Sequence, residues 1–118
     1  MIYTRPWGHY KILLENNVCK VKIISMKPNS KLSLQSHEKR QELWQVVQGK
    51  GLVTNGDNKI EIKYGDSHFI PKGSIHRMEN IGIEDLVFIE VQTGESFSEE
   101  DIRRYQDDYG RAEKEIKE

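Results

Sequence analysis

Four side chains of metal-ligating type lie in two separate segments of this chain. Gln35 and His37 are two residues apart, and residues at that spacing on a β-strand point to the same face. Glu42 follows across a turn, and His76 belongs to a later segment. Imidazole and carboxylate groups bind zinc, cobalt, nickel, manganese or iron, and an amide oxygen completes the set. We predict one divalent metal site here, with zinc as the first choice; the alternative, ordinary structural residues, has to account for four ligand types at a paired spacing.

The elements that must position these residues are expected to be β-strands. Apolar and polar residues alternate over 18–26, 32–37 and 59–64, which is typical of half-buried strands. Short apolar runs at 43–47, 52–54, 68–70 and 86–91 add further strands, and Asn55-Gly56-Asp57-Asn58 is a hairpin turn signal. Many short strands separated by turns predict an all-β sandwich or barrel.

The end of the chain differs in composition from the body. Most residues from Ser98 to Glu118 are charged. Ser98 is a candidate N-cap before three acidic residues, and Phe97 and Ile102 have the spacing of a hydrophobic staple. We therefore predict a short C-terminal helix from Glu99 to Gln106. The expected domain covers residues 1–111, and residues 112–118 form a charged tail.

Composition excludes several classes of protein. The net charge of the 118 residues is −1, which argues against a nucleic-acid binder driven by bulk charge. No apolar run reaches the roughly 20 residues of a membrane span, and the first residues lack a signal-peptide core. Cys19 is the only cysteine, so no internal disulfide forms. We expect a cytoplasmic protein with neither a nucleic acid nor a membrane as partner.

The spacing of the candidate ligands resembles the two motifs of the cupin superfamily. The first motif, two ligands followed by a glutamate and a glycine, is matched by Gln35, His37, Glu42 and Gly49. Its usual opening glycine is Asn29 here, a residue that also tolerates a left-handed backbone. The second motif is matched throughout by Gly65, Pro71, Gly73, His76 and Asn80. The resemblance implies a single cupin barrel, a double-stranded β-helix or jelly roll.

A narrower resemblance covers nearly the whole chain, from Arg5 to Arg111. The segments at 5–10, 32–37, 89–94, 100–104 and 108–111 look like blocks of type II phosphomannose isomerase domains. In many members of that family the domain follows a mannose-1-phosphate guanylyltransferase domain, and here we expect the isomerase domain as a stand-alone chain. The family often has more histidines after the first ligand, where this sequence has Glu38, Lys39 and Leu43.

The resemblance implies interconversion of mannose 6-phosphate and fructose 6-phosphate through a cis-enediol. A metal ion would bind O1 and O2 of the sugar, and a general base would move the proton between C1 and C2. Glu90 is the candidate base because it lies in an otherwise apolar strand; a buried Glu paired with an arginine is an equal alternative. Gln92, on the same strand face, is a candidate partner of a sugar hydroxyl, or else a polar residue at the barrel end.

Arginines are the expected partners of the substrate phosphate, because a guanidinium recognises phosphate through paired hydrogen bonds. Arg40 lies between two predicted ligands, and three others belong to the family blocks: Arg5, Arg104 and Arg111. For any one of them a surface ion pair is the alternative.

Two other classes of function are open at this point. One is a non-catalytic module that binds a sugar or sugar nucleotide, and the other is a different cupin enzyme, such as a sugar epimerase or an oxygenase. Fold alone does not choose among them. The resemblance also implies a homodimer, in agreement with the need of a small barrel to protect its edge strands.

Overall fold

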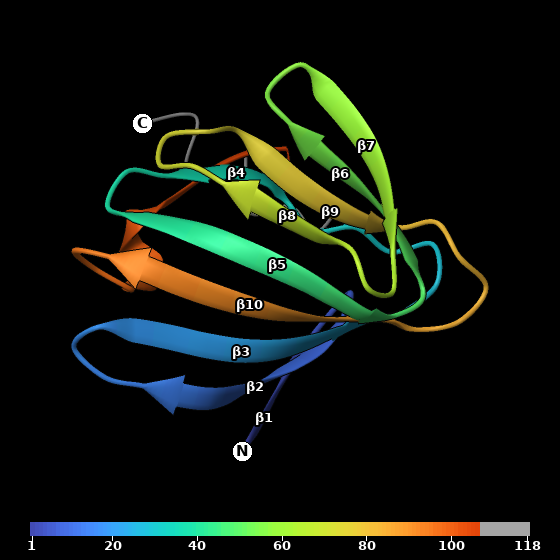
Figure 1. Ribbon diagram of the computed structural model, residues 1–118, viewed down its shortest axis with the longest axis horizontal. Helices are drawn as coiled ribbons and strands as arrows, with labels where there is room; N and C mark the ends of the chain where they lie inside the picture. Colours follow the sequence, from blue (N-terminus) through green and yellow to red (C-terminus); the bar gives the residue numbers. More distant parts are fainter. Residues whose placement is uncertain (107–118) are drawn as a thin grey trace.

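The computed structural model describes residues 1–106, which form two antiparallel β-sheets (Figure 1). The first sheet has six strands in the order β1 (Ile2–Arg5), β2 (Gly8–Glu15), β3 (Cys19–Met26), β10 (Leu86–Gly94), β5 (Arg40–Gln48) and β8 (Ser67–Ile70). The second has five in the order β11 (Ile102–Gln106), β4 (Leu34–His37), β9 (His76–Asn80), β6 (Lys50–Asn55) and β7 (Asn58–Lys63). The all-β prediction is confirmed.

The short C-terminal helix predicted for Glu99–Gln106 is wrong. Ser98 does cap a turn, since its side chain accepts a hydrogen bond of 3.1 Å from the backbone N–H of Glu100. That turn is a 3₁₀ segment, η1, of only three residues (Glu99–Asp101), and β11 follows it at once. The open edge of β4 offers backbone partners to this segment, and the Tyr105 hydroxyl lies 3.0 Å from Ser36 Oγ. These long-range contacts override the local helix signals.

The inner face of the first sheet changes from apolar to polar along its strands. Ile24, Phe88 and Val46 lie side by side on β3, β10 and β5 and pack into the hydrophobic core. Two residues further along, Lys22, Glu90 and Trp44 lie side by side in the same way, and all three are buried. Buried charges need partners, so this polar end of the barrel is the place to look for a site.

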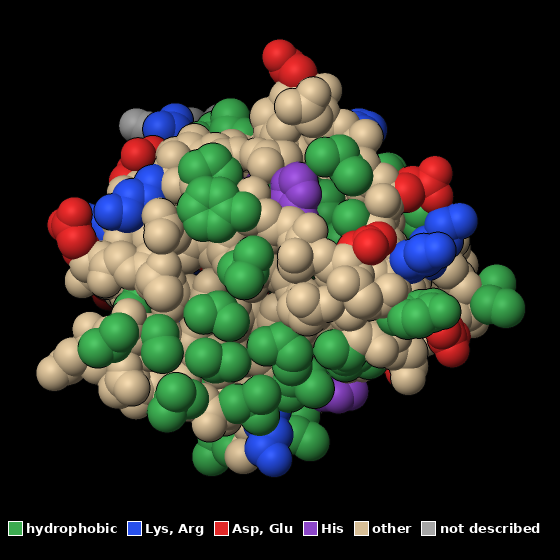
Figure 2. All heavy atoms as spheres, in the orientation of Figure 1, with side chains coloured by type: hydrophobic (Ala, Val, Ile, Leu, Met, Phe, Trp, Pro, Cys, Tyr) green, Lys and Arg blue, Asp and Glu red, His purple; other side chains and the backbone are tan. Residues whose placement is uncertain are grey.

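The outer face of the same sheet is uncharged across three adjacent strands. Its outward positions on β3, β10 and β5 carry no Asp, Glu, Lys or Arg: Cys19, Val21, Ile23, Ser25, Val87, Ile89, Val91, Thr93, Gln41, Leu43, Gln45 and Val47. Hydrophobic side chains gather over these strands in Figure 2. Leu43 and Val47 are 42% and 49% exposed, so this is an open apolar surface and not a covered one.

Asn29 takes the backbone conformation expected at the first motif. Its φ is +63°, and it is the one non-glycine residue with a positive φ among residues 1–106. Asparagine adopts this region at lower cost than other side chains, so the departure from glycine is tolerated. Within the same residues, no helix has the length and apolar character needed to cross a membrane.

Candidate metal centre and its cavity

Three of the predicted metal ligands converge in the interior of the barrel. His37 on β4, Glu42 on β5 and His76 on β9 each offer a ligand atom, and these atoms all lie within 4.8 Å of one another. All three side chains are buried, and His37 Nε2 lies 3.2 Å from Glu42 Oε2. Gln35, the fourth predicted ligand, lies directly opposite His76 in the β4–β9 pair.

Both histidines have lowered pKa values, which keep their rings neutral and able to bind a metal. Burial, followed by the charge of Arg40, lowers the pKa of His37 to about 3. Burial also lowers the pKa of His76 to about 4. His76 Nδ1 lies 2.8 Å from the carbonyl oxygen of Ser74 and donates to it in the neutral ring, which leaves a lone pair on Nε2. Two neutral imidazoles and a carboxylate form a donor set that fits a divalent transition metal, with the amide of Gln35 as the predicted fourth donor.

Glu42 is fixed by two buried hydrogen-bond donors. Arg40 Nε donates to Glu42 Oε2 at 3.1 Å, and Trp44 Nε1 donates to Glu42 Oε1 at 2.9 Å. Arg40 is 2% exposed and also donates through Nη1 to the carbonyl oxygen of Ser98 at 3.2 Å. Arg40, predicted to contact phosphate, therefore has a second task, which is to hold a metal ligand in place.

Glu90 lies beside this group in a setting that suits a general base. Trp44 Nε1 also donates to Glu90 Oε1 at 3.2 Å, and Gln92 Nε2 donates to Glu90 Oε2 at 2.8 Å. Burial, followed by the negative charge of Glu42, raises the pKa of Glu90 to about 7, while Lys22 lowers it. A carboxyl group with such a pKa exchanges its proton near neutral pH.

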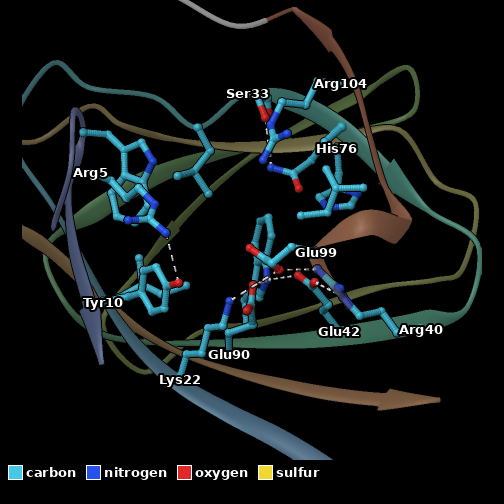
Figure 3. Close-up of a pocket in the computed structure, with 16 residues that line it drawn as sticks. Arg5, Tyr10, Lys22, Ser33, Arg40, Glu42, His76, Glu90, Glu99 and Arg104 are labelled. Carbon is cyan, nitrogen blue, oxygen red and sulfur yellow. Dashed lines mark hydrogen bonds and ion pairs between the residues drawn. The ribbon is translucent and has the colours of Figure 1, made fainter. Parts of the chain in front are cut away.

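A cavity of about 270 Å³ opens in front of Glu42, Glu90 and His76 (Figure 3). Its walls carry three further cationic side chains from different elements: Arg5 on β1, Lys22 on β3 and Arg104 on β11. Arg5 Nη2 donates to the Tyr10 hydroxyl at 3.3 Å. The volume suits a small polar ligand, and the charges suit an anionic one.

Only some of the residues predicted to contact the substrate line this cavity. Arg5, Arg40 and Arg104 line the cavity, whereas Arg111 lies outside the described residues. Gln92 is fully buried behind Glu90 and does not reach the cavity wall, so it supports the candidate base instead of facing a ligand.

Sequence reasoning missed Lys22 as a cavity residue. Its side chain is 8% exposed, and its Nζ lies 4.4 Å from the centre of the Tyr10 ring. A signal was present in the alternation of β3, because Lys20 and Lys22 share a face with Ile24 and Met26. Lysine at a core-facing position is rare unless it has a partner or a function.

Comparisons with known proteins show which sequences and folds this chain is similar to. The family model described as "Mannose-6-phosphate isomerase C-terminal" matches residues 1–107. The Xanthan biosynthesis protein XanB of Xanthomonas campestris pv. campestris (strain B100) is 44% identical over 91% of this chain and 23% of its own length. Mannose-1-phosphate guanylyltransferase ManC of Salmonella typhimurium (strain LT2) is 42% identical over 91% of this chain and 22% of its own length. The chain thus spans less than a quarter of each of these two relatives.

The fold matches solved structures of much lower sequence similarity. The cupin domain of Schizosaccharomyces pombe Cnp3 superposes with a TM-score of 0.71 at 16% identity, over 73% of this chain and 64% of that one. This likeness identifies the barrel as a cupin fold and carries no information about activity.

Proposed function

The chain belongs to the mannose-6-phosphate isomerase C-terminal family, and we propose that it is a metal-dependent isomerase that interconverts mannose 6-phosphate and fructose 6-phosphate. The observation that supports this most is the position of Glu90. A buried carboxyl group with a pKa raised to about 7 lies next to three converging metal ligands, in a cavity with cationic walls. Aldose–ketose isomerisation needs a base and a means to stabilise negative charge, and a phosphorylated sugar also needs a binding site for its phosphate.

In this proposal Glu90 moves a proton from C2 of mannose 6-phosphate to C1, while the proton of the O2 hydroxyl passes to O1, so that the aldose becomes the ketose. Trp44 and Gln92 donate to its two oxygens, so the carboxyl group is held in one orientation toward the cavity. A divalent metal held by Gln35, His37, Glu42 and His76 would bind the sugar oxygens and, as a Lewis acid, stabilise enediolate charge. Zinc is the first choice for this ion, and a cytoplasmic location stays a prediction.

The experiment that tests the proposal is an isomerase assay on protein loaded separately with zinc, cobalt, nickel, manganese and iron. Equilibration of mannose 6-phosphate with fructose 6-phosphate supports the proposal. Glu90→Gln should lower kcat by about 10²–10⁴-fold, the range of general-base catalysis, while leaving metal binding intact. Glu84→Gln is a matched control, because Glu84 is exposed and does not line the cavity.

Absence of turnover with every metal contradicts the isomerase assignment. If the wild-type protein then binds the sugar phosphate without converting it, the chain acts as a sugar-phosphate binding module. The turnover assay together with this binding measurement therefore separates the isomerase from the non-catalytic binding module.

A further inference from the structure

The cavity contains a carboxylate oxygen that lies between two buried cations. Glu99 Oε2 is 4.0 Å from Lys22 Nζ and 3.9 Å from Arg40 Nη2 (Figure 3). The side chains of Lys22 and Arg40 are 8% and 3% exposed, whereas that of Glu99 is 52% exposed. Two buried cations that share one anion define a position at which negative charge is favoured.

Glu99 does not neutralise the positive charge of this cavity. Four cationic and three acidic side chains line it, including Glu99 itself, and burial keeps the lining His76 neutral. An anion with more than one negative charge would therefore neutralise the net positive charge of the cavity lining better than the single carboxylate of Glu99.

The contacts of Glu99 are also of a kind that exchanges readily. Both distances are longer than a hydrogen bond, and half of the side chain lies in solvent, so the pairing is weak. The turn that carries Glu99 is held by other groups: Ser98 O accepts from Arg40 Nη1, and the Asp101 carboxylate accepts from the backbone N–H of Lys39 at 2.9 Å. The Glu99 side chain can leave without disrupting the turn.

We propose that the position between Lys22 and Arg40 is a phosphate subsite, and that the Glu99 carboxylate occupies it as a built-in competitor until a phosphate monoester displaces it. A phosphate group brings up to two charges and three terminal oxygens, enough to accept charge-assisted hydrogen bonds from both cations. Arg40 can contribute Nη2 while Nε stays on Glu42. This inference rests on the proposed function only in taking the phosphate to be that of a sugar.

The test uses inorganic phosphate as the probe and calorimetric titration of the full chain, at an ionic strength held constant with chloride. Glu99→Gln keeps the shape of the side chain and removes the competing charge, so phosphate affinity should rise on the order of tenfold, the effect of one charge-assisted contact. Glu100→Gln is the matched control on the same turn, because Glu100 does not line the cavity, and its affinity should stay within about twofold of wild type.

Lys22→Met should lower phosphate affinity on the order of tenfold or more, because it removes one of the two cations and keeps the apolar stem. Lys20→Met is its control: Lys20 is buried on the same strand face, pairs with Glu15 at 3.9 Å and does not line the cavity. If Lys22→Met binds phosphate as well as Lys20→Met does, the subsite is wrong.

If Glu99→Gln binds phosphate no more tightly than Glu100→Gln does, the competitor role of Glu99 is wrong. This comparison tests that role even if Lys22→Met fails to fold. Phosphate binding requires no isomerisation. Expected affinities without turnover of mannose 6-phosphate would contradict the proposed function alone. Turnover with unchanged phosphate affinity in both variants would contradict this inference alone.

Discussion

A single indole N–H connects the two carboxyl groups of the candidate site. Trp44 Nε1 lies 2.9 Å from Glu42 Oε1 and 3.2 Å from Glu90 Oε1. Glu42 has Arg40 as a further partner, while Glu90 has the neutral amide of Gln92. Two carboxyl groups in such different surroundings take different roles: Glu42 is oriented by Arg40 beside the candidate metal ligands, and Glu90, with a pKa raised to about 7, can exchange a proton.

At the residue scale we predict that metal affinity resists acid. Ordinary histidines lose metal as pH falls through about 6.5, because protons compete for the ring nitrogens. Burial lowers the pKa of His37 to about 3 and of His76 to about 4, so their nitrogens stay free of protons at pH 5. Zinc affinity measured by calorimetry should therefore change little from these two rings between pH 7 and 5, and His76→Ala should abolish tight binding. A steep loss of affinity centred near pH 6.5 that persists in Glu90→Gln would contradict this, because that variant removes the neighbouring carboxyl group whose pKa is raised to about 7.

The pH dependence of catalysis is set by Glu90 in the proposed mechanism. A base works in its ionised form, and burial together with Glu42 raises the pKa of Glu90 to about 7 in the absence of a metal. A bound cation favours the ionised form, so the pKa in the loaded protein should lie below that value. We expect kcat/KM to fall as pH drops below 7, with the midpoint between the ordinary carboxyl range and 7. A profile that is flat down to pH 4 would contradict Glu90 as the base.

At the scale of strands, the sequence predicts an element correctly where nearby residues determine its structure, and not where contacts with distant residues determine it. Alternation indicated β3, and turn chemistry indicated the β6–β7 hairpin, because both signals lie within a few residues. The helix expected after Ser98 was wrong because the edge of β4, distant in sequence, pairs with β11. Spacing within two motifs predicted the candidate metal ligands, three of which converge in the structure. Glu99 and Lys22 meet only through the folded barrel, so no local pattern links them.

Gly94 is predicted to be essential where β10 ends beside the start of β5. Its φ is +143°, and a Cβ added there would lie 2.8 Å from Arg40 Cα and closer still to the carbonyl oxygen of Lys39. Gly94→Ala should lower the free energy of unfolding by about 2 kcal/mol, as expected for backbone strain with overpacking. It should also weaken metal binding, because Arg40 holds Glu42. Urea denaturation measures the first effect and zinc titration the second.

Gly82→Ala is the control for that substitution. A Cβ at Gly82 meets its nearest neighbours at 3.5–3.6 Å, which is ordinary contact. Its free energy of unfolding should stay within about 0.5 kcal/mol of wild type. Equal stabilities of the two variants would show that the close approach at Gly94 relaxes without cost.

At the scale of the whole molecule, the outer face of β3, β10 and β5 differs from the rest of the protein because it carries no charged residue. Charged residues make up 31% of the chain, yet none occupies the outward positions of these strands. Such a surface resembles the apolar centre of an interface between sheets. We expect the homodimer implied by the family resemblance to use this face, because an uncharged surface packs against its own copy without repulsion.

Sedimentation should therefore give twice the chain mass of 13.8 kDa. Leu43→Lys should shift the protein toward monomer, since it places a charge in the centre of the face. Ile60→Lys is the control: Ile60 is 41% exposed, close to the 42% of Leu43, but lies on β7 of the other sheet. A wild-type protein that sediments as a monomer would overturn the expectation.

The positions of the tryptophans mean that the intrinsic fluorescence of the protein can report on a bound metal ion. The chain has only two, Trp7 and Trp44, and both line the cavity. The Trp44 ring lies 5.6 Å from the ring of His76, within reach of quenching by an ion held there. Paramagnetic cobalt or nickel would dim the intrinsic fluorescence, whereas closed-shell zinc would leave it bright. Occupancy and identity of the bound ion could thus be followed in an unlabelled sample.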